Sequence, residues 1–567
     1  MSGGFGSGPS GDDPKRAKLS IWGVQGPPPL WNLIYKVRGK SIPWPGFNTK
    51  RTHAPSTPYE HSSPMHSKKI PAMCYETLIM MAKGTPLEAK LNQLLRWNTD
   101  ATMYANISPN MPGHPDQSKP SSVPMVGVQA LFDDEIIKEI HESEVLRYAT
   151  LFTVYEEAKH RQRPILWPRT LNEFLEYIAD FTLPGVKKQL SAASKVFWAA
   201  CFDLTASFFQ CPLTYEVSRN FCFRAENGKC YAFQRMVMGF APSCEIMETI
   251  LEVVIAYALR DFPGISHDPF VDNVRFGVPD NNPTYLADAA LSFRSACAKA
   301  NITLNVEPLN APHQQGIYTG IEYDYAAGTA SNTDKTRLKL ARARTAILSS
   351  TATLDEVFEA FGILFFASSV VDYDLGSHYH SFKFFRRKAA LFSQGQLKLS
   401  HPTPVWNCIR VELAQWFDAL ADPLLKAPIR RTNSGYVRLF TDASLSGAGA
   451  VLFDAEGLVH TWARKWTPLE ASRPIHELEA IAAFEAMVFF QPYLTGNHVD
   501  LFVDNTSVIG AAKKGYSPSF HFNSHIRNLL DHIRAHGARV QYVKSAHNPS
   551  DCESRRFAEK KPNYVVA

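Results

Sequence analysis

Carboxylates at the ends of short apolar segments are the feature that most constrains the fold of this chain. The first set contains Asp203, which ends the apolar run from Val196, and Asp272, which lies in Phe-Val-Asp-Asn. A second set follows at Asp442, Glu479, Asp504 and Asp551. A carboxylate beside a buried strand is costly unless a cation compensates its charge. The pattern therefore predicts sheets whose strand ends gather acidic side chains.

Paired divalent cations are the compensation that suits both sets. Hard cations prefer oxygen ligands, and magnesium takes few of them from protein. Two such ions promote in-line displacement at phosphorus. We therefore expect Mg²⁺ or Mn²⁺, two ions in each site, and chemistry on nucleic acid at both. Asn273 stands where a further carboxylate is expected in the first set, and it offers an uncharged oxygen ligand.

Composition bounds the class of protein. The chain has 567 residues, of which 45% are hydrophobic and 20% charged, as expected for a soluble protein of three or four domains. Its net charge of +5 neither requires nor excludes nucleic acid. The nine cysteines lack Cys-x-x-Cys spacing, which indicates reduced thiols and an intracellular location, nuclear, cytoplasmic or both. No uncharged apolar run reaches membrane-spanning length, so we expect no membrane partner.

Four regions are expected along the chain. Residues 1–125 read as a Pro-, Ser- and Gly-rich extension that is partly disordered. Residues 126–330 mix strands and helices, with an amphipathic helix near 136–158. Residues 331–430 are mostly helical, and 431–567 form an α/β unit. The strands expected in that unit are 437–441, 447–453, 458–462, 499–504 and 539–545, and the helices are 476–488 and 520–536.

A series of motifs in the middle of the chain resembles the successive motifs of a reverse transcriptase in order and spacing. These are Arg161-Gln-Arg163, Phe202-Asp203-Leu204, Met238-Gly239-Phe240, Phe270-Val-Asp-Asn273, Ile302-Thr-Leu-Asn305 and Tyr318-Thr-Gly320-Ile321. The resemblance covers about residues 150–567. It is closest to retrotransposon enzymes, and among them to DIRS-type elements, the tyrosine-recombinase group that includes VIPER. It implies a right-hand polymerase with fingers, palm and thumb/connection, an α/β and α+β multidomain fold.

The resemblance also implies a role for each matching residue. Asp203 and Asp272 would be the catalytic metal ligands of the palm, with Asn273 in the place of a second adjacent Asp. The remaining substrate contacts would come from Arg161, Arg163, Phe208, Met238, Gly239, Tyr318 and Gly320.

Each of these contacts has a physical reason. Either Arg161 or Arg163 would clamp the incoming triphosphate, because guanidinium makes bidentate contacts to phosphate. Phe208 would exclude a 2′-hydroxyl, or else it simply packs in the core. Gly239 would let the backbone approach the template, and the hairpin at Tyr318 would grip the primer end.

The C-terminal acidic set resembles the RNase H domain of retroelements, with all four acidic positions occupied. Glu477 competes with Glu479 for the second position. Glu479 is preferred because two alanines of the same helix then fall where it must pack closely. His547 would assist product release, or else it is a surface-loop histidine. The more specific motifs are Thr441-Asp-Ala-Ser444 and Val503-Asp-Asn-Thr506.

One expectation and one alternative follow. The chain is expected to be an RNA-directed DNA polymerase with a fused RNase H, which copies retroelement RNA into DNA and degrades the RNA of the hybrid. Its partners would be an RNA template, a DNA primer, the RNA–DNA hybrid and dNTPs, with the oligomeric state left open. The alternative is a domesticated or polymerase-impaired nucleic-acid-binding protein that retains RNase H activity, as Asn273 suggests.

Overall fold

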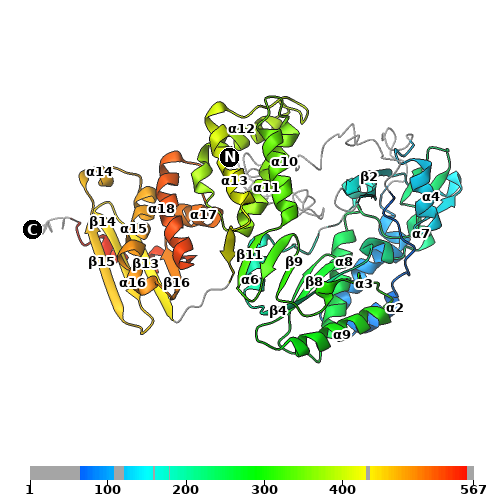
Figure 1. The fold of residues 1–567 in the computed structure, drawn as a ribbon, viewed down its shortest axis with the longest axis horizontal. Coiled ribbons are helices and arrows are strands. Elements are labelled where there is room, and N and C mark those ends of the chain that lie inside the picture. The colour runs from blue at the N-terminus through cyan, green and yellow to red at the C-terminus, as the bar shows by residue number, and fades with distance from the viewer. Residues whose placement is uncertain are drawn as a thin grey trace, which may run out of the picture. The chain divides into compact units, whose positions relative to one another are not determined.

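The computed structural model describes residues 64–107, 120–156, 160–175, 177, 179–429 and 435–558. The chain divides into two compact units, one reaching Gly328 and the other beginning at Thr329 (Figure 1). The disorder expected within residues 1–63 and 108–119 lies outside the described residues. Within the described ranges, no helix has the length and apolar character needed to cross a membrane.

An antiparallel three-stranded sheet carries the first acidic set. Its strands are β4 (Trp198–Asp203), β8 (Asn273–Val278) and β7 (Ser266–Phe270), in the order β4-β8-β7. Helices α8 (Ser243–Ala258) and α9 (Pro283–Lys299) pack against these strands and against each other. The aromatic rings that join the sheet to α9 are Phe202, Phe276 and Phe293.

The prediction of a helix near 136–158 is wrong. The segment forms β1 (Ile137–Ile140) and β2 (Thr150–Glu156) instead. Strand β1 pairs with β6 (Cys230–Phe233), and β2 pairs with β3 (Arg161–Trp167). Isoleucines spaced like a helical face are also β-branched, and their cross-strand partners decide the outcome.

The Ile302-Thr-Leu-Asn305 segment pairs with the chain after β4 only through a single bridge between Leu204 and Leu304. The remaining elements of the unit are β5 (Cys222–Arg224), β9 (Gln315–Tyr318), β10 (Ile321–Asp324), α4 (Met125–Asp133), α5 (Arg169–Phe174), α6 (Val186–Ala193) and α7 (Tyr215–Ser218).

The residues before 126 are not all a separate extension. Helices α2 (Tyr75–Ala82) and α3 (Glu88–Thr99) pack against α8 in the same core as the sheet. The Trp97 ring contacts Phe240, which follows the Met-Gly motif. The expected boundary at 125/126 therefore divides one packed unit, because the Pro- and His-rich composition concealed two helices with a buried apolar face.

Helices dominate the first part of the second unit, as the sequence predicted for this region. They are α10 (Asp334–Ile347), α11 (Leu354–Val370), α12 (Tyr379–Ser393) and α13 (Asn407–Ala421). A short antiparallel pair, β11 (Thr329–Asn332) and β12 (Lys426–Pro428), brackets them. The aromatic core includes Trp416, which lies edge-on to Phe361 and donates its indole N–H to Ser368.

A five-stranded sheet forms the rest of this unit. Its order is β15-β14-β13-β16-β17, with β13, β15, β16 and β17 running in one direction and β14 antiparallel to them. The strands are β13 (Tyr436–Ala443), β14 (Gly447–Phe453), β15 (Val459–Lys465), β16 (His498–Val503) and β17 (Arg539–Tyr542). The helices are α14 (Pro468–Ala471), α15 (Ile475–Phe489), α16 (Gln491–Leu494), α17 (Thr506–Lys514), α18 (Phe520–His536) and α19 (Asp551–Ser554).

The α/β arrangement explains how the second acidic set is carried. Helices α15 and α18 lie beside the sheet (Figure 1) and share one apolar core with it, while α19 packs on β13 and β14. The helical part is joined to this domain by Asp374, which pairs with Arg527 and Arg534 of α18. The expected boundary at 430/431 lies in undescribed residues, and contacts on either side of it make one compact unit.

Candidate active sites

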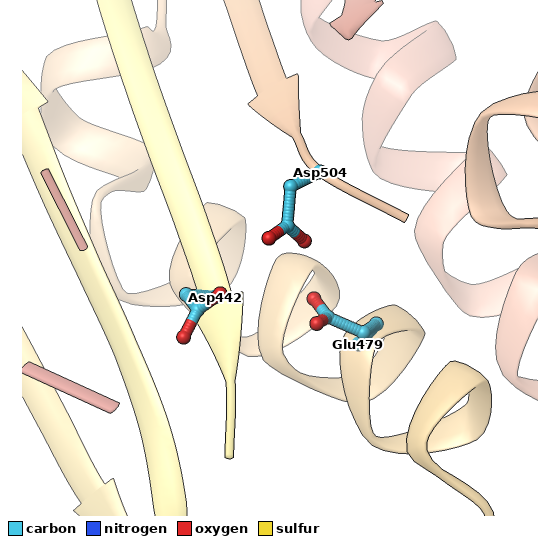
Figure 2. Close-up of side chains that lie close together, drawn as sticks. All are labelled: Asp442, Glu479 and Asp504. Atoms are coloured by element: carbon cyan, nitrogen blue, oxygen red, sulfur yellow. The ribbon is translucent and has the colours of Figure 1, made fainter. Parts of the chain in front are cut away.

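Three carboxylates of the second set converge at one edge of the five-stranded sheet (Figure 2). Asp442 lies near the end of β13, Asp504 directly follows β16, and Glu479 projects from α15. One oxygen from each side chain lies within 4.8 Å of one oxygen from each of the others. The parallel pairing of Thr441 with Val503 places both aspartates at the same end of adjacent strands.

Glu479 is the most perturbed of these acids. Its side chain is buried, and Oε2 finds no hydrogen-bond partner among the described residues. Burial raises the pKa of Glu479 to about 9, and the charges of Asp442 and Asp504 add to the effect. An unpartnered buried oxygen facing two further carboxylates is the arrangement that a cation would satisfy.

The other two acids are oriented by hydroxyl groups. Ser545 Oγ donates to Asp504 Oδ2 at 2.6 Å, and the buried Ser554 hydroxyl donates to Asp442 Oδ2. Burial raises the pKa of Asp442, while the hydrogen bond from Ser554 opposes that shift. The donor set is made of oxygen atoms alone and carries excess negative charge, which fits a hard divalent cation such as Mg²⁺ or Mn²⁺.

The remaining predicted residues of this domain lie apart from that group. Asp551 begins α19 and pairs with Arg555 at 2.7 Å, and the acidic group found among the described residues does not include it. Glu477 pairs with Arg473 at 3.5 Å. His547 is exposed in a short turn. Of the two competing glutamates, the structure therefore brings Glu479 into the cluster.

The first acidic set is brought together by the β4-β8-β7 sheet. Asp203 ends β4 and lies directly opposite Asn273 in the antiparallel ladder. Asp272 occupies the turn between β7 and β8, and its carbonyl accepts the N–H of Leu204 at 3.0 Å. Asp203 and Asp272 therefore lie at the same end of the adjacent strands β4 and β8.

Neutral donors contact both of these carboxylates. Asn305 Nδ2 donates to Asp203 Oδ2 at 2.6 Å, and Ser207 Oγ donates to Asp272 Oδ2 at 2.8 Å. Asn273 Nδ2 donates to Asp272 Oδ1 at 2.9 Å. Asn273 was expected among the metal ligands, but here its amide nitrogen serves the neighbouring carboxylate. The opposite amide orientation would set an oxygen against a carboxylate oxygen, which is repulsive.

A buried carboxylate of α8 holds the turn that carries Asp272. Val271 adopts a left-handed φ of +57°, which is costly for a β-branched residue. Its N–H donates to Glu248, whose pKa burial raises to about 7. Sequence reasoning missed Glu248, because a glutamate within an apolar helix carries no motif.

The two candidate triphosphate ligands lie on β3 and share one partner. Arg161 and Arg163 both pair with Glu156 of β2. Burial raises the pKa of Asp272, and the charge of Arg163 is among the influences that lower it. Arg163 therefore lies within electrostatic reach of Asp272.

The other predicted contacts are distributed around this sheet. Phe208 is partly buried against the core, in agreement with its packing alternative. Gly239, beside Met238, has a φ of +112°, and its carbonyl accepts from Asn172 Nδ2 at 2.7 Å. Gly320 turns the chain between β9 and β10 with a φ of +81°. The buried Tyr318 hydroxyl donates to the carbonyl of Asp268, and the carbonyl of Asn273 lies 3.4 Å from the same hydroxyl.

An unpredicted arginine lies beneath the acidic turn. Arg275 is buried in β8, pairs with Asp268 of β7 at 2.8 Å and lies over the rings of Tyr318 and Tyr323 at 4.9 and 4.8 Å. It joins the β7-β8 hairpin to the hairpin of β9 and β10. The sequence offered no signal for this role, since Arg275 sits inside an otherwise apolar strand.

Solved structures of a foamy viral enzyme are among those similar to this chain. The foamy viral protease-reverse transcriptase "dRH" in complex with double-stranded DNA aligns at 14% identity and a TM-score of 0.45, covering 83% of this chain and 81% of that one. The same enzyme in complex with an RNA/DNA hybrid aligns at 14% identity and a TM-score of 0.43, covering 83% and 62%.

A family model matches the C-terminal part of the chain. The matched range contains Asp442, Glu479 and Asp504, the three carboxylates that converge, and it ends before Asp551. Residues 433–519 are similar to the family described as the RNase H-like domain found in reverse transcriptase.

Proposed function

We propose that this chain is an RNA-directed DNA polymerase with a fused RNase H, encoded by a retroelement of the DIRS type. The observation that carries the proposal is the convergence of Asp442, Glu479 and Asp504 within a range matched by the reverse-transcriptase RNase H family. The DIRS-type assignment and the polymerase rest on the ordered motifs from Arg161 to Ile321. The substrates would be dNTPs, an RNA template with a DNA primer, and the resulting RNA–DNA hybrid.

In the nuclease, the protein's part is to hold two divalent cations beside the RNA strand. Asp442, Glu479 and Asp504 would be the ligands, with Asp551 of α19 as a fourth once it leaves Arg555. When bound in either site, the cations activate the attacking oxygen and stabilise the charge on the leaving group. Ser545 and Ser554 keep two of the ligands oriented without adding charge.

In the polymerase, Asp203 and Asp272 would hold the cations at the edge of the β4-β8-β7 sheet. Arg163 would then bind the triphosphate, because its charge already reaches Asp272. Tyr318, through its bond to the Asp268 carbonyl of β7, would keep the primer-gripping hairpin in register with the β7-β8 hairpin that carries the acidic turn.

Helix α10 supplies a surface that would contact the duplex. Lys335 and Lys339 are exposed one turn apart on this helix. Cations at that spacing suit the phosphate backbone of nucleic acid, whose binding should weaken with salt. A protein acting on retroelement RNA in this way would work in the cytoplasm, the nucleus or both.

Two activities of the full chain test this function. Primer extension is measured on poly(rA)/oligo(dT) with Mg²⁺ or Mn²⁺, and cleavage is measured on a labelled RNA–DNA hybrid. Asp203→Asn should stop extension and spare cleavage, whereas Asp442→Asn should stop cleavage and spare extension. Cleavage that persists in Asp442→Asn would refute the nuclease assignment.

The second candidate is a polymerase-impaired protein that keeps its nuclease, and Asn273 is the observation that favours it. It predicts hybrid cleavage without extension under either cation. Recovery of extension in Asn273→Asp alone would identify the amide as the lesion. Extension by the natural sequence would exclude this candidate.

A further inference from the structure

A buried serine beside Asp442 has no counterpart in the predicted site. Ser554 ends α19, is fully buried, and donates its hydroxyl to Asp442 Oδ2. Building on the proposed nuclease, we propose that Ser554 is a positioning residue, which holds one oxygen of Asp442 so that the other faces the cation site.

The surrounding hydroxyls fix the position of Ser554. Its carbonyl accepts from Ser444 Oγ at 2.6 Å and from Ser446 Oγ at 3.3 Å, and both of these serines follow Asp442 in the chain. Its own N–H donates to the carbonyl of Ser550 at 3.0 Å. The loop after β13 and the end of α19 therefore bind each other next to the Asp442 carboxylate.

Glycine in β14 makes this approach possible. Gly449 lies directly opposite Asp442 in the ladder, so the two residues face the same side of the sheet. A Cβ atom at Gly449 would overlap the backbone nitrogen of Ser554 and the carbonyl carbon of Glu553. Only a residue without a side chain leaves room for α19 to bring Ser554 to Asp442.

The chemistry of the donor suits a cation site. A hydroxyl group favours the ionised form of Asp442, whereas a lysine or arginine in its place would also repel the metal. Because Ser554 already holds one oxygen of Asp442, the Asp442 side chain loses less conformational freedom when a cation binds. Loss of such an outer partner costs roughly 10- to 100-fold in metal affinity or activity.

The test measures metal binding directly as well as activity. Mn²⁺ binding is followed by calorimetry in the full chain carrying Asp203→Asn, so that the signal reports the C-terminal cluster. Cleavage of the RNA–DNA hybrid is measured against Mn²⁺ concentration and against hybrid concentration. Ser554→Ala is compared with Ser550→Ala, an equally buried serine of the same turn whose hydroxyl bonds to Asn548 instead.

Ser554→Ala should weaken Mn²⁺ binding roughly 10- to 100-fold and raise the Mn²⁺ needed for half-maximal cleavage in step, with the KM for hybrid unchanged. Ser550→Ala should change neither. Mn²⁺ affinity in Ser554→Ala equal to that of its parent would overturn the proposal. Should Ser554→Ala fail to fold, Ser554→Cys keeps the size but donates weakly, and unaltered binding there would overturn it equally. Unaltered Mn²⁺ binding and cleavage in Asp442→Asn would instead refute the proposed function.

Discussion

The two acidic sites solve the same charge problem in different ways. At the β4-β8-β7 edge, the amides of Asn305 and Asn273 and the hydroxyl of Ser207 contact the carboxylates of Asp203 and Asp272. At the C-terminal cluster, Glu479 keeps an oxygen without a partner among the described residues. Protein donors contact both carboxylates of the first site, whereas the second site leaves one buried carboxylate oxygen without such a contact. Sites built from the same kinds of acidic side chain can therefore differ in how completely protein groups satisfy them.

The largest expected effect is a difference in hybrid cleavage between variants of two glutamates in α15. Glu479→Gln should reduce hybrid cleavage by more than the roughly 100-fold that the loss of an outer metal partner costs. Glu477→Gln, a matched control whose partner is Arg473, should retain cleavage. Rates measured on the labelled hybrid decide between them. The reverse result would move the second metal position to Glu477.

Without metal, the cost of ionising the buried Glu479 should appear as a loss of folding stability at high pH. Because the pKa of Glu479 lies near 9 in the fold and near 4.5 when unfolded, the folded chain binds the extra proton. Stability is therefore full below pH 4.5 and lost as pH rises towards 9, by an amount on the order of a few kcal/mol.

Thermal unfolding in EDTA between pH 5 and pH 9 measures this loss. Glu479→Gln should flatten the dependence, and Mn²⁺ should restore stability at high pH. An identical slope in Glu479→Gln would show that other groups cause it. Burial raises the pKa of Asp272 as well, so Asp272→Asn should also remove part of the slope.

Removing a neutral donor should weaken the first site. Asn273→Ala takes a hydrogen bond from Asp272 and should slow primer extension about tenfold, as for a bond to a charged group. Asn273→Asp should lower the cation concentration needed for half-maximal extension, because it adds a third carboxylate. Extension by Asn273→Ala at the natural rate would show that the amide does not orient Asp272.

The smallest expected effect distinguishes the two arginines of β3. Arg163→Ala should raise the KM for dNTPs several-fold more than Arg161→Ala, because the charge of Arg163 reaches Asp272. Both variants lose one pairing with Glu156, so each serves as the control for the other. Equal effects would mean that the pair acts as one cationic patch.

The acidic residues at strand ends were predictable because each stands beside the apolar residues that form its strand. Asp442 and Asp504 each follow an apolar run, and the structure places both at neighbouring strand ends. The structure near 136–158 could not be predicted correctly. Its β-branched residues have helical spacing, but they form a strand because they pair with β6, about 90 residues away in the chain. The sequence also did not predict α17 or the two helices before residue 107, because these helices are stabilised by packing against distant elements.

Supporting residues were the hardest part of the sites to predict. Ser554 and Asn305 reach Asp442 and Asp203 from 112 and 102 residues away. Ser554 belongs to none of the motifs, and the motif that contains Asn305 gave no sign of its contact with Asp203. Short polar side chains carry no periodicity, so only the fold reveals which carboxylate they serve. The acids themselves were recognisable, while the groups that orient them were not.

Because α19 lies near the C-terminal end of the described residues, the two sites become complete in a fixed order as the chain is translated. The sheet and hairpins of the first site are complete once the chain has been made to about residue 325, whereas Asp442 receives its hydroxyl partner only with Ser554. A chain still being translated through α19 would hold a complete first site and an incomplete second cluster. Under the proposed function, C-terminally truncated chains that lack α19 should lose hybrid cleavage before primer extension, because both Ser554 and the proposed ligand Asp551 are missing.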